Sequence, residues 1–205
     1  MKRLAAIHTR WLLAPAGLLA PILLPARAQA HLNSTGLGPV YDGVAHLLLT
    51  PEDFIPVLAL ALLAGQRGAA YGRRALFVLP VAWLVGGIFG LAGAMAGSTA
   101  LACISFLLLG GLLAADAKVS LRVLTGLSAL VGLSHGYLNG ADMGPPEHAA
   151  LVLPGMAAAV FVLVALAAAF VVRLRQQWAR IAVRVLGSWI VASGLLLLGW
   201  AVRKT

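Results

Sequence analysis

Six apolar stretches of about 20 residues follow one another beyond residue 40, and this pattern constrains the fold more than any other feature of the chain. A helix of that length crosses a bilayer because it makes all its backbone hydrogen bonds internally. The chain is 61% hydrophobic and 10% charged, with a mean hydropathy of +0.98, which leaves too little polar surface for a soluble domain. We therefore expect an all-α fold: a polytopic membrane helix bundle with six transmembrane helices after a cleavable signal peptide.

The connections between these stretches are too short to separate domains, so residues 31–205 should form a single transmembrane helical domain. The expected elements are a short apolar segment over residues 41–49 and six helices over residues 51–65, 75–96, 99–115, 119–139, 149–172 and 180–202. Glycines four residues apart, at Gly86 and Gly90 and at Gly132, Gly136 and Gly140, predict that two of these helices approach their neighbours closely.

Residues 1–30 have the pattern of a secretory signal peptide. A basic start is followed by an apolar region over residues 11–24 and by the sequence Ala28-Gln29-Ala30, which is typical of a cleavage site. An uncleaved anchor helix is the alternative, but the short apolar length argues against it. Cleavage would make His31 the first residue, and its free amine and imidazole could hold a metal ion together. An ordinary flexible terminus is the other interpretation of His31.

Basic residues gather after the first, third and fifth expected helices. They are Arg67, Arg73, Arg74, Lys118, Arg122, Arg173, Arg175, Arg180 and Arg184. The positive-inside rule makes that side cytoplasmic, with the mature amino terminus on the periplasmic side of a bacterial inner membrane. Arg203 and Lys204 conflict with this topology. Because the charge of +9 is divided among short connections, it does not indicate a nucleic-acid partner.

A first group of polar residues begins at His46 and ends at the helix start Thr50-Pro51-Glu52-Asp53. Thr50 is expected to be the N-cap, and Pro51 the first helical residue. Asp53 either complements the helix dipole or lines a site. In the second case the chain breaks at Pro51, residues 41–49 form a half-helix, and His46 comes close to Asp53.

A second group of polar residues lies near the outer end of the fourth helix. His135 and Asn139 are four residues apart and share a helix face, and Asp142 lies about one turn beyond. A histidine within an apolar helix either bonds structurally to another helix or acts as a ligand. Imidazole and carboxylate donors suit several divalent ions, and nickel or cobalt fits, although donor type alone does not select the metal.

These residues carry a resemblance to the HupE/UreJ family of hydrogenase and urease accessory membrane proteins, regarded as nickel or cobalt permeases. The similar segments are Ala30-His31, Gly36-Leu37-Gly38, His46 to Asp53, and His135 to Gly140. Compared with the family patterns, Asp53, Asn139 and Asp142 exchange nitrogen for oxygen donors. The resemblance implies a permease or accessory protein that takes up a divalent metal ion, with hydrogenase or urease maturation proteins, or a second copy of the chain, as partners besides the lipid bilayer.

We therefore expect a metal site made by His46, Asp53, His135, Asn139 and Asp142, with His31 assisting. We expect no permanently bound cofactor, with the divalent ion as the transported ligand. Two alternatives stay open: a redox subunit with His46 and His135 as axial haem ligands, and a non-catalytic assembly partner. An enzyme is not expected, because the sequence contains no H-E-x-x-H motif and no recognisable serine–histidine–acid arrangement. The single cysteine, Cys103, excludes an internal disulfide.

Overall fold

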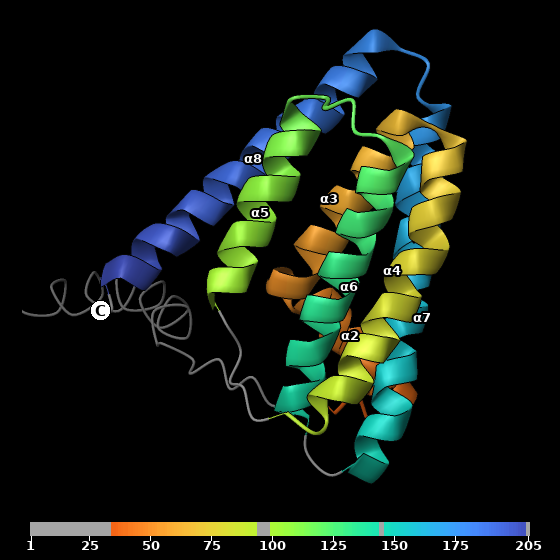
Figure 1. Ribbon diagram of the computed structural model, residues 1–205, viewed down its shortest axis with the longest axis vertical. Helices are drawn as coiled ribbons and strands as arrows, with labels where there is room; N and C mark the ends of the chain where they lie inside the picture. Colours follow the sequence, from red (N-terminus) through yellow and green to blue (C-terminus); the bar gives the residue numbers. More distant parts are fainter. Residues whose placement is uncertain (1–33, 94–98, 144–145, 204–205) are drawn as a thin grey trace, which may run out of the picture. The chain divides into compact units, whose positions relative to one another are not determined.

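A computed structural model of the protein describes residues 34–93, 99–143 and 146–203, with the side chains of residues 146–148 left out. By its internal contacts the chain divides at His31, and Leu32–Thr205 forms one compact unit. The predicted signal peptide and His31 lie outside the described residues. Figure 1 shows the helices of the second unit.

The described residues form seven α-helices and no strand, which confirms the expected all-α class. The helices are α2 (Pro39–Leu49), α3 (Pro51–Arg67), α4 (Ala69–Gly90), α5 (Thr99–Ala114), α6 (Leu121–Asp142), α7 (Pro146–Arg173) and α8 (Gln177–Arg203). They correspond one by one to the expected elements. The largest difference is at α4, which begins six residues before the expected residue 75 and ends at Gly90, six residues before the expected residue 96. The early start was missed because the apolar pattern does not reveal the polar first turns of a helix.

The expected number of six membrane spans is not confirmed, because the described helices include three candidate spans, or four if a bent pair counts as one. By length and composition, three helices could each cross a membrane: α4, residues Ala149–Arg173 of α7, and α8. The pair α2 and α3 would make a fourth, broken span. Helix α5 is apolar but has 16 residues, which corresponds to a length of about 24 Å, shorter than a typical hydrocarbon core.

The predicted break at Pro51 is present. Helices α2 and α3 meet at Thr50 with a bend of 76°. Thr50 adopts an extended conformation (φ −100°, ψ 98°), as expected for a residue that precedes proline. The expected N-cap is correct in position but not in chemistry: the Thr50 side chain makes no capping bond, and its carbonyl accepts from the Asp53 and Phe54 amides. The bend therefore starts α3 at a new angle, with Asp53 in its first turn.

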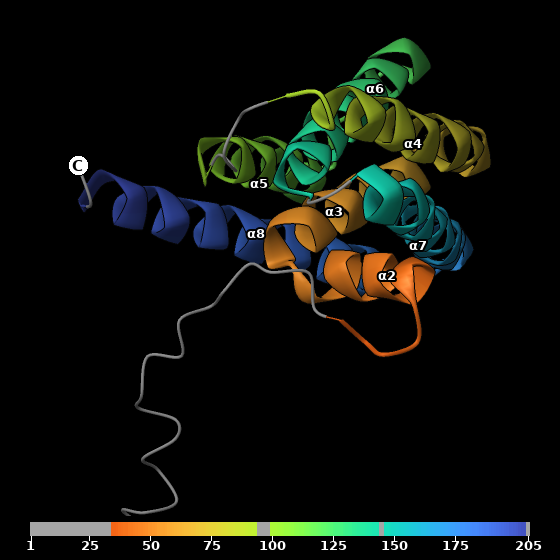
Figure 2. The same cartoon turned by 90° about the horizontal axis from the view of Figure 1, so that it is seen from below.

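Helix α3 lies at the centre of the bundle, and Figure 2 shows the other labelled helices around it. It contacts each of the other described helices. Most of its residues are buried, including an unbroken run from Ala59 to Gln66. In its first turn, Asp53 is therefore held inside the bundle, whereas Glu52 is exposed.

The glycine rows bring α4 and α6 together, which confirms the predicted close approach. At several positions, the first carbon of any side chain would overlap a carbonyl oxygen of the facing helix: Gly86 with Leu133, Gly90 with Tyr137, Gly136 with Trp83, and Gly140 with Gly87. The two backbones are therefore in direct contact. This packing sets the position of His135, which lies directly before Gly136 in the sequence.

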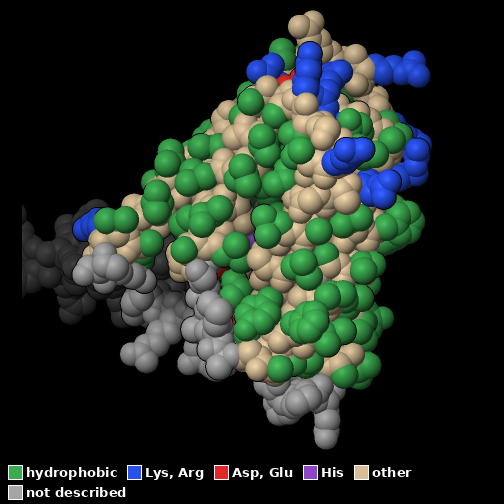
Figure 3. All heavy atoms as spheres, in the orientation of Figure 1, with side chains coloured by type: hydrophobic (Ala, Val, Ile, Leu, Met, Phe, Trp, Pro, Cys, Tyr) green, Lys and Arg blue, Asp and Glu red, His purple; other side chains and the backbone are tan. Residues whose placement is uncertain are grey.

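Lysine and arginine side chains gather at the end of the bundle where α3 joins α4, α5 joins α6 and α7 joins α8 (Figures 1 and 3). Two of these arginines donate to the end of α5 and the residues after it: Arg67 Nη1 to the Ala117 carbonyl at 3.2 Å, and Arg184 Nε to the Ala114 carbonyl at 2.9 Å. The structure thus collects the basic residues of these three connections at one end, as the predicted topology requires, whereas Arg203 at the far end of α8 lies away from them.

Candidate functional site

His135 is the centre of a buried polar cluster made by three helices. Its Nδ1 lies 2.9 Å from Asp53 Oδ1 on α3, and its Nε2 lies 3.0 Å from Ser105 Oγ on α5. Both ring nitrogens therefore have a partner. The predicted convergence of an imidazole and a carboxylate from separate helices is present for this pair.

Asn139 completes the cluster from one turn further along α6. Its Nδ2 donates to Asp53 Oδ2 at 2.9 Å and to the His135 carbonyl at 2.9 Å. The shared helix face that was predicted from the four-residue spacing is confirmed. Since the amide nitrogen makes both bonds, the amide oxygen remains available to accept a donor or to bind a cation.

The cluster is removed from water. His135 is 3% exposed, Asp53 6%, Asn139 7% and Ser105 5%. Burial of an isolated carboxylate is strongly unfavourable unless hydrogen bonds or an opposite charge compensate it. Asp53 has both kinds of support, because it accepts two bonds from α6 and lies in the first turn of α3, where the helix dipole favours negative charge.

Sequence reasoning did not identify Ser105. This serine lies in the apolar helix α5, in the run Cys103-Ile104-Ser105-Phe106. A polar residue in such a helix was the available signal, but Ser128 on α6 gives the same signal and bonds to its own helix instead, to the Leu124 carbonyl. Sequence alone could not separate the two serines.

The hydrogen bonds also correct the statement that no serine–histidine–acid arrangement exists. Ser105, His135 and Asp53 form such a chain in space, with separations of 30 and 82 residues along the sequence. A nucleophilic serine needs a place for a substrate beside its hydroxyl group, whereas Ser105 is enclosed by the bundle. We interpret the serine as a group that fixes the orientation and tautomer of the imidazole.

Trp83 on α4 forms one wall of the cluster. Its ring stacks on that of His135, with centroids 6.0 Å apart and planes inclined by 21°. The Trp83 side chain is fully buried, and its Nε1 has no hydrogen-bond partner among the described residues. An unpaired N–H beside the imidazole is a donor that could serve a water molecule or an anion accompanying a bound cation.

The other predicted ligands do not join this cluster through any described contact. His46 is half-buried on α2, and among the described residues its side chain makes no hydrogen bond or ion pair. Asp142 is exposed at the last residue of α6. The participation of His46, Asp142 and His31 in a metal site stays a prediction.

The donors present are one imidazole, one carboxylate, one amide oxygen and one hydroxyl group. Within the part of the chain that the structure describes, no group of three or more histidine, cysteine and acidic residues is placed to hold a metal. Imidazole nitrogen combined with carboxylate oxygen suits divalent transition metals such as nickel and cobalt.

Comparison with known proteins identifies one family. The family model described as HupE / UreJ protein matches residues 19–197, which is most of the chain and includes every residue of the cluster. Neither a curated protein nor a solved structure shows significant similarity to the chain.

Proposed function

Because the chain belongs to the HupE/UreJ family of membrane proteins associated with nickel or cobalt transport or accessory functions, we propose that it takes up a divalent transition-metal ion, nickel or cobalt, across the bacterial inner membrane. The observation that carries this proposal is the buried contact of Asp53 with His135 and Asn139. It supplies nitrogen and oxygen donors within a bundle whose buried residues are mostly apolar.

The site lies toward the end of the bundle opposite the basic residues. Asp53 is in the first turn of α3, whereas Arg67 is its last residue. His135 precedes the end of α6 at Asp142 by seven residues, or about 10 Å along the helix axis. If the basic end is cytoplasmic, a metal ion captured from the periplasm meets this cluster about two turns into the bundle.

Binding of the ion by both atoms would replace the hydrogen bond between His135 Nδ1 and Asp53 Oδ1. In a neutral imidazole, the proton would then lie on Nε2, where the Ser105 oxygen can accept it, and Nδ1 would be free to bind the metal. Metal–ligand distances of about 2.1 Å require only modest movement of two atoms that are 2.9 Å apart. Asn139 Oδ1 and the Ser105 hydroxyl group are the next oxygen donors.

The membrane potential favours inward movement of a divalent cation. It supplies about 4.6 kcal/mol per 100 mV for two charges. Uptake would therefore need no nucleotide-hydrolysing domain, and the sequence contains no G-x-x-x-x-G-K-[ST] motif.

The decisive experiment measures uptake of radiolabelled nickel by cells that express the full chain. His135→Ala removes the imidazole, and we expect uptake at least tenfold lower with an unchanged amount of protein in the membrane. The matched control is Ser134→Ala, because the adjacent serine bonds only to carbonyls of its own helix among the described residues. Normal uptake by the His135 variant would refute the proposal and would favour the assembly-partner hypothesis.

The haem hypothesis is less compatible with the cluster. An axial histidine needs one ring nitrogen free for iron, whereas both nitrogens of His135 have protein partners. An absorption spectrum of the purified protein tests this alternative directly, since a Soret band would support it.

A further inference from the structure

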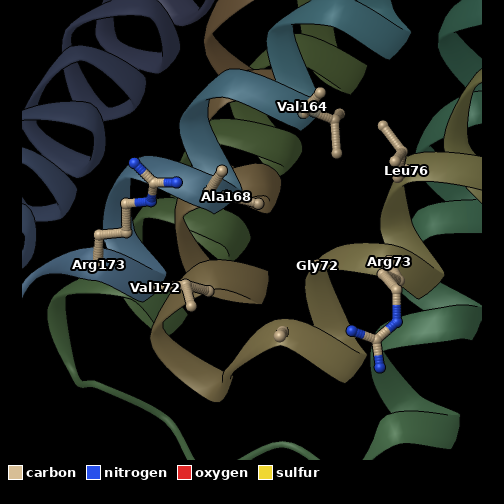
Figure 4. Close-up of a pocket in the computed structure, with 10 residues that line it drawn as sticks. Gly72, Arg73, Leu76, Val164, Ala168, Val172 and Arg173 are labelled. Carbon is tan, nitrogen blue, oxygen red and sulfur yellow. The ribbon is translucent and has the colours of Figure 1, made fainter.

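A groove lies between α4 and α7, near the basic end of the bundle and separate from the cluster around His135. Its volume is about 260 Å³. Figure 4 shows Gly72, Arg73 and Leu76 of α4 on one side and Val164, Ala168, Val172 and Arg173 of α7 on the other. The remaining lining residues are Ala69, Ala165 and Ala169. Eight of the ten lining residues are thus apolar or glycine.

The groove exists because the residues along it are small. An added Cβ at Gly72 would lie 3.3 Å from the Cβ of Ala168, so the two helices already touch at this level. Alanines and Gly72 leave open space beside this contact, and the longer side chains of Leu76 and Val164 continue it along the helices. An apolar groove of this kind fits part of an acyl chain.

Each helix also contributes one arginine to the groove. Arg73 follows the first turn of α4, and Arg173 is the last residue of α7. None of the described residues that line the groove is acidic. Arg67 and Arg184 donate to carbonyl groups, whereas Arg73 and Arg173 make no hydrogen bond or ion pair with any described residue. Their guanidinium groups remain available for an anionic partner.

We propose that this groove is a binding site for an anionic phospholipid of the leaflet at the basic end of the bundle. Arg73 on one side of the groove and Arg173 on the other provide positive charge for the anionic headgroup, and the apolar groove between them holds the upper part of an acyl chain. Basic pockets between transmembrane helices are a known way to recognise such headgroups. A free phosphate would bind the arginines but would leave the apolar part of the groove empty, so the apolar lining of the groove favours a lipid. The site is independent of the proposed metal transport.

The test compares lipid retention by the full chain in nanodiscs that contain phosphatidylcholine with a minor share of phosphatidylglycerol. The double variant Arg73→Gln with Arg173→Gln removes both headgroup contacts. Its control is Arg74→Gln with Arg175→Gln, which removes the same charge from neighbouring arginines that do not line the groove. By native mass spectrometry, we expect the first variant to retain phosphatidylglycerol about tenfold more weakly than the control. Equal retention by the two variants would overturn the proposal.

A second part of the experiment tests whether the apolar groove holds an acyl chain. Ala165→Phe, at a half-buried lining position, fills the groove while keeping both arginines, and we expect it to lose bound phosphatidylglycerol. Soluble glycerol phosphate, which carries the headgroup chemistry without an acyl chain, should not displace the lipid. Displacement by glycerol phosphate, or full retention by the Ala165 variant, would mean that the arginines attract phosphate without a lipid site. Circular dichroism and elution as a single species confirm that each variant is folded.

Discussion

At the scale of single residues, the cluster is stabilised because its buried hydrogen-bond donors and acceptors pair with one another. The Asp53 carboxylate requires donors because it is buried, and His135 and Asn139 supply them from one face of α6. Breaking such a buried pair by removing one partner typically costs about 3–5 kcal/mol, so these contacts contribute to folding as well as to any metal site. Variants at these positions must therefore be compared with controls for protein amount.

Ser105 gives the sharpest prediction at this scale. Ser105→Ala removes the partner of His135 Nε2 without touching the Asp53 contact. Since groups that orient a ligating histidine typically change metal affinity by about 10–100-fold, we expect nickel affinity to fall within that range. Calorimetric titration of the purified protein with nickel measures it.

The control for this prediction is Ser128→Ala. Ser128 is fully buried, like Ser105, but its hydroxyl group donates to the Leu124 carbonyl of its own helix. Nickel affinity should be unchanged in this variant. Equal losses in the two variants would show that the effect comes from a general disturbance of packing rather than from the imidazole.

At the scale of helices, two features place the cluster. The bend of 76° between α2 and α3 begins α3 inside the bundle, so its polar first turn meets α6. The glycines of α4 and α6 then allow their backbones to touch, which brings Trp83 against the His135 ring. The site thus depends on backbone proximity that larger residues would prevent.

Two glycines of α6 test this dependence. A Cβ at Gly136 would overlap the Trp83 carbonyl, whereas a Cβ at Gly126 meets nothing within 4 Å. We expect Gly136→Ala to lower the free energy of unfolding by about 1–3 kcal/mol through overpacking. Gly126→Ala should leave it unchanged or raise it by about 0.5–1 kcal/mol, since alanine favours the helix. Unfolding in mixed detergent micelles measures both, and a smaller loss at Gly136 than at Gly126 would contradict the packing argument.

At the scale of the whole molecule, charge separates the two ends of the bundle. The arginines and lysine of three connections lie together, and the first turn of α3 lies inside the bundle, away from them. The positive-inside rule assigns the basic end to the cytoplasm.

Cysteine labelling checks this orientation. The native Cys103 is 2% exposed and should not react, so single cysteines can be introduced directly. Lys118→Cys, at an exposed position of the basic end, should react with a membrane-impermeant maleimide only after the cytoplasmic side is opened. Glu52→Cys, exposed at the opposite end, should react in intact spheroplasts. The reverse pattern would invert the proposed direction of transport.

The sequence by itself determined the helices, the break at Pro51, the glycine contacts and the pairing of His135 with Asn139. Each of these follows from local chemistry: apolar length, the restriction that proline imposes, the absence of a side chain, and the helical repeat. Asp53 could be named as a candidate, but its role as a helix-dipole residue or a site residue stayed open.

Only the tertiary structure decided which polar groups meet. It joined Asp53 to His135 across 82 residues of sequence, added Ser105, placed Trp83 beside the imidazole, and left His46 and Asp142 outside the hydrogen-bonded cluster. The physical reason is that a helical pattern specifies which residues share a face of one helix. It does not specify which neighbour that face meets, because this depends on the bend after α2 and on how closely the backbones can pack.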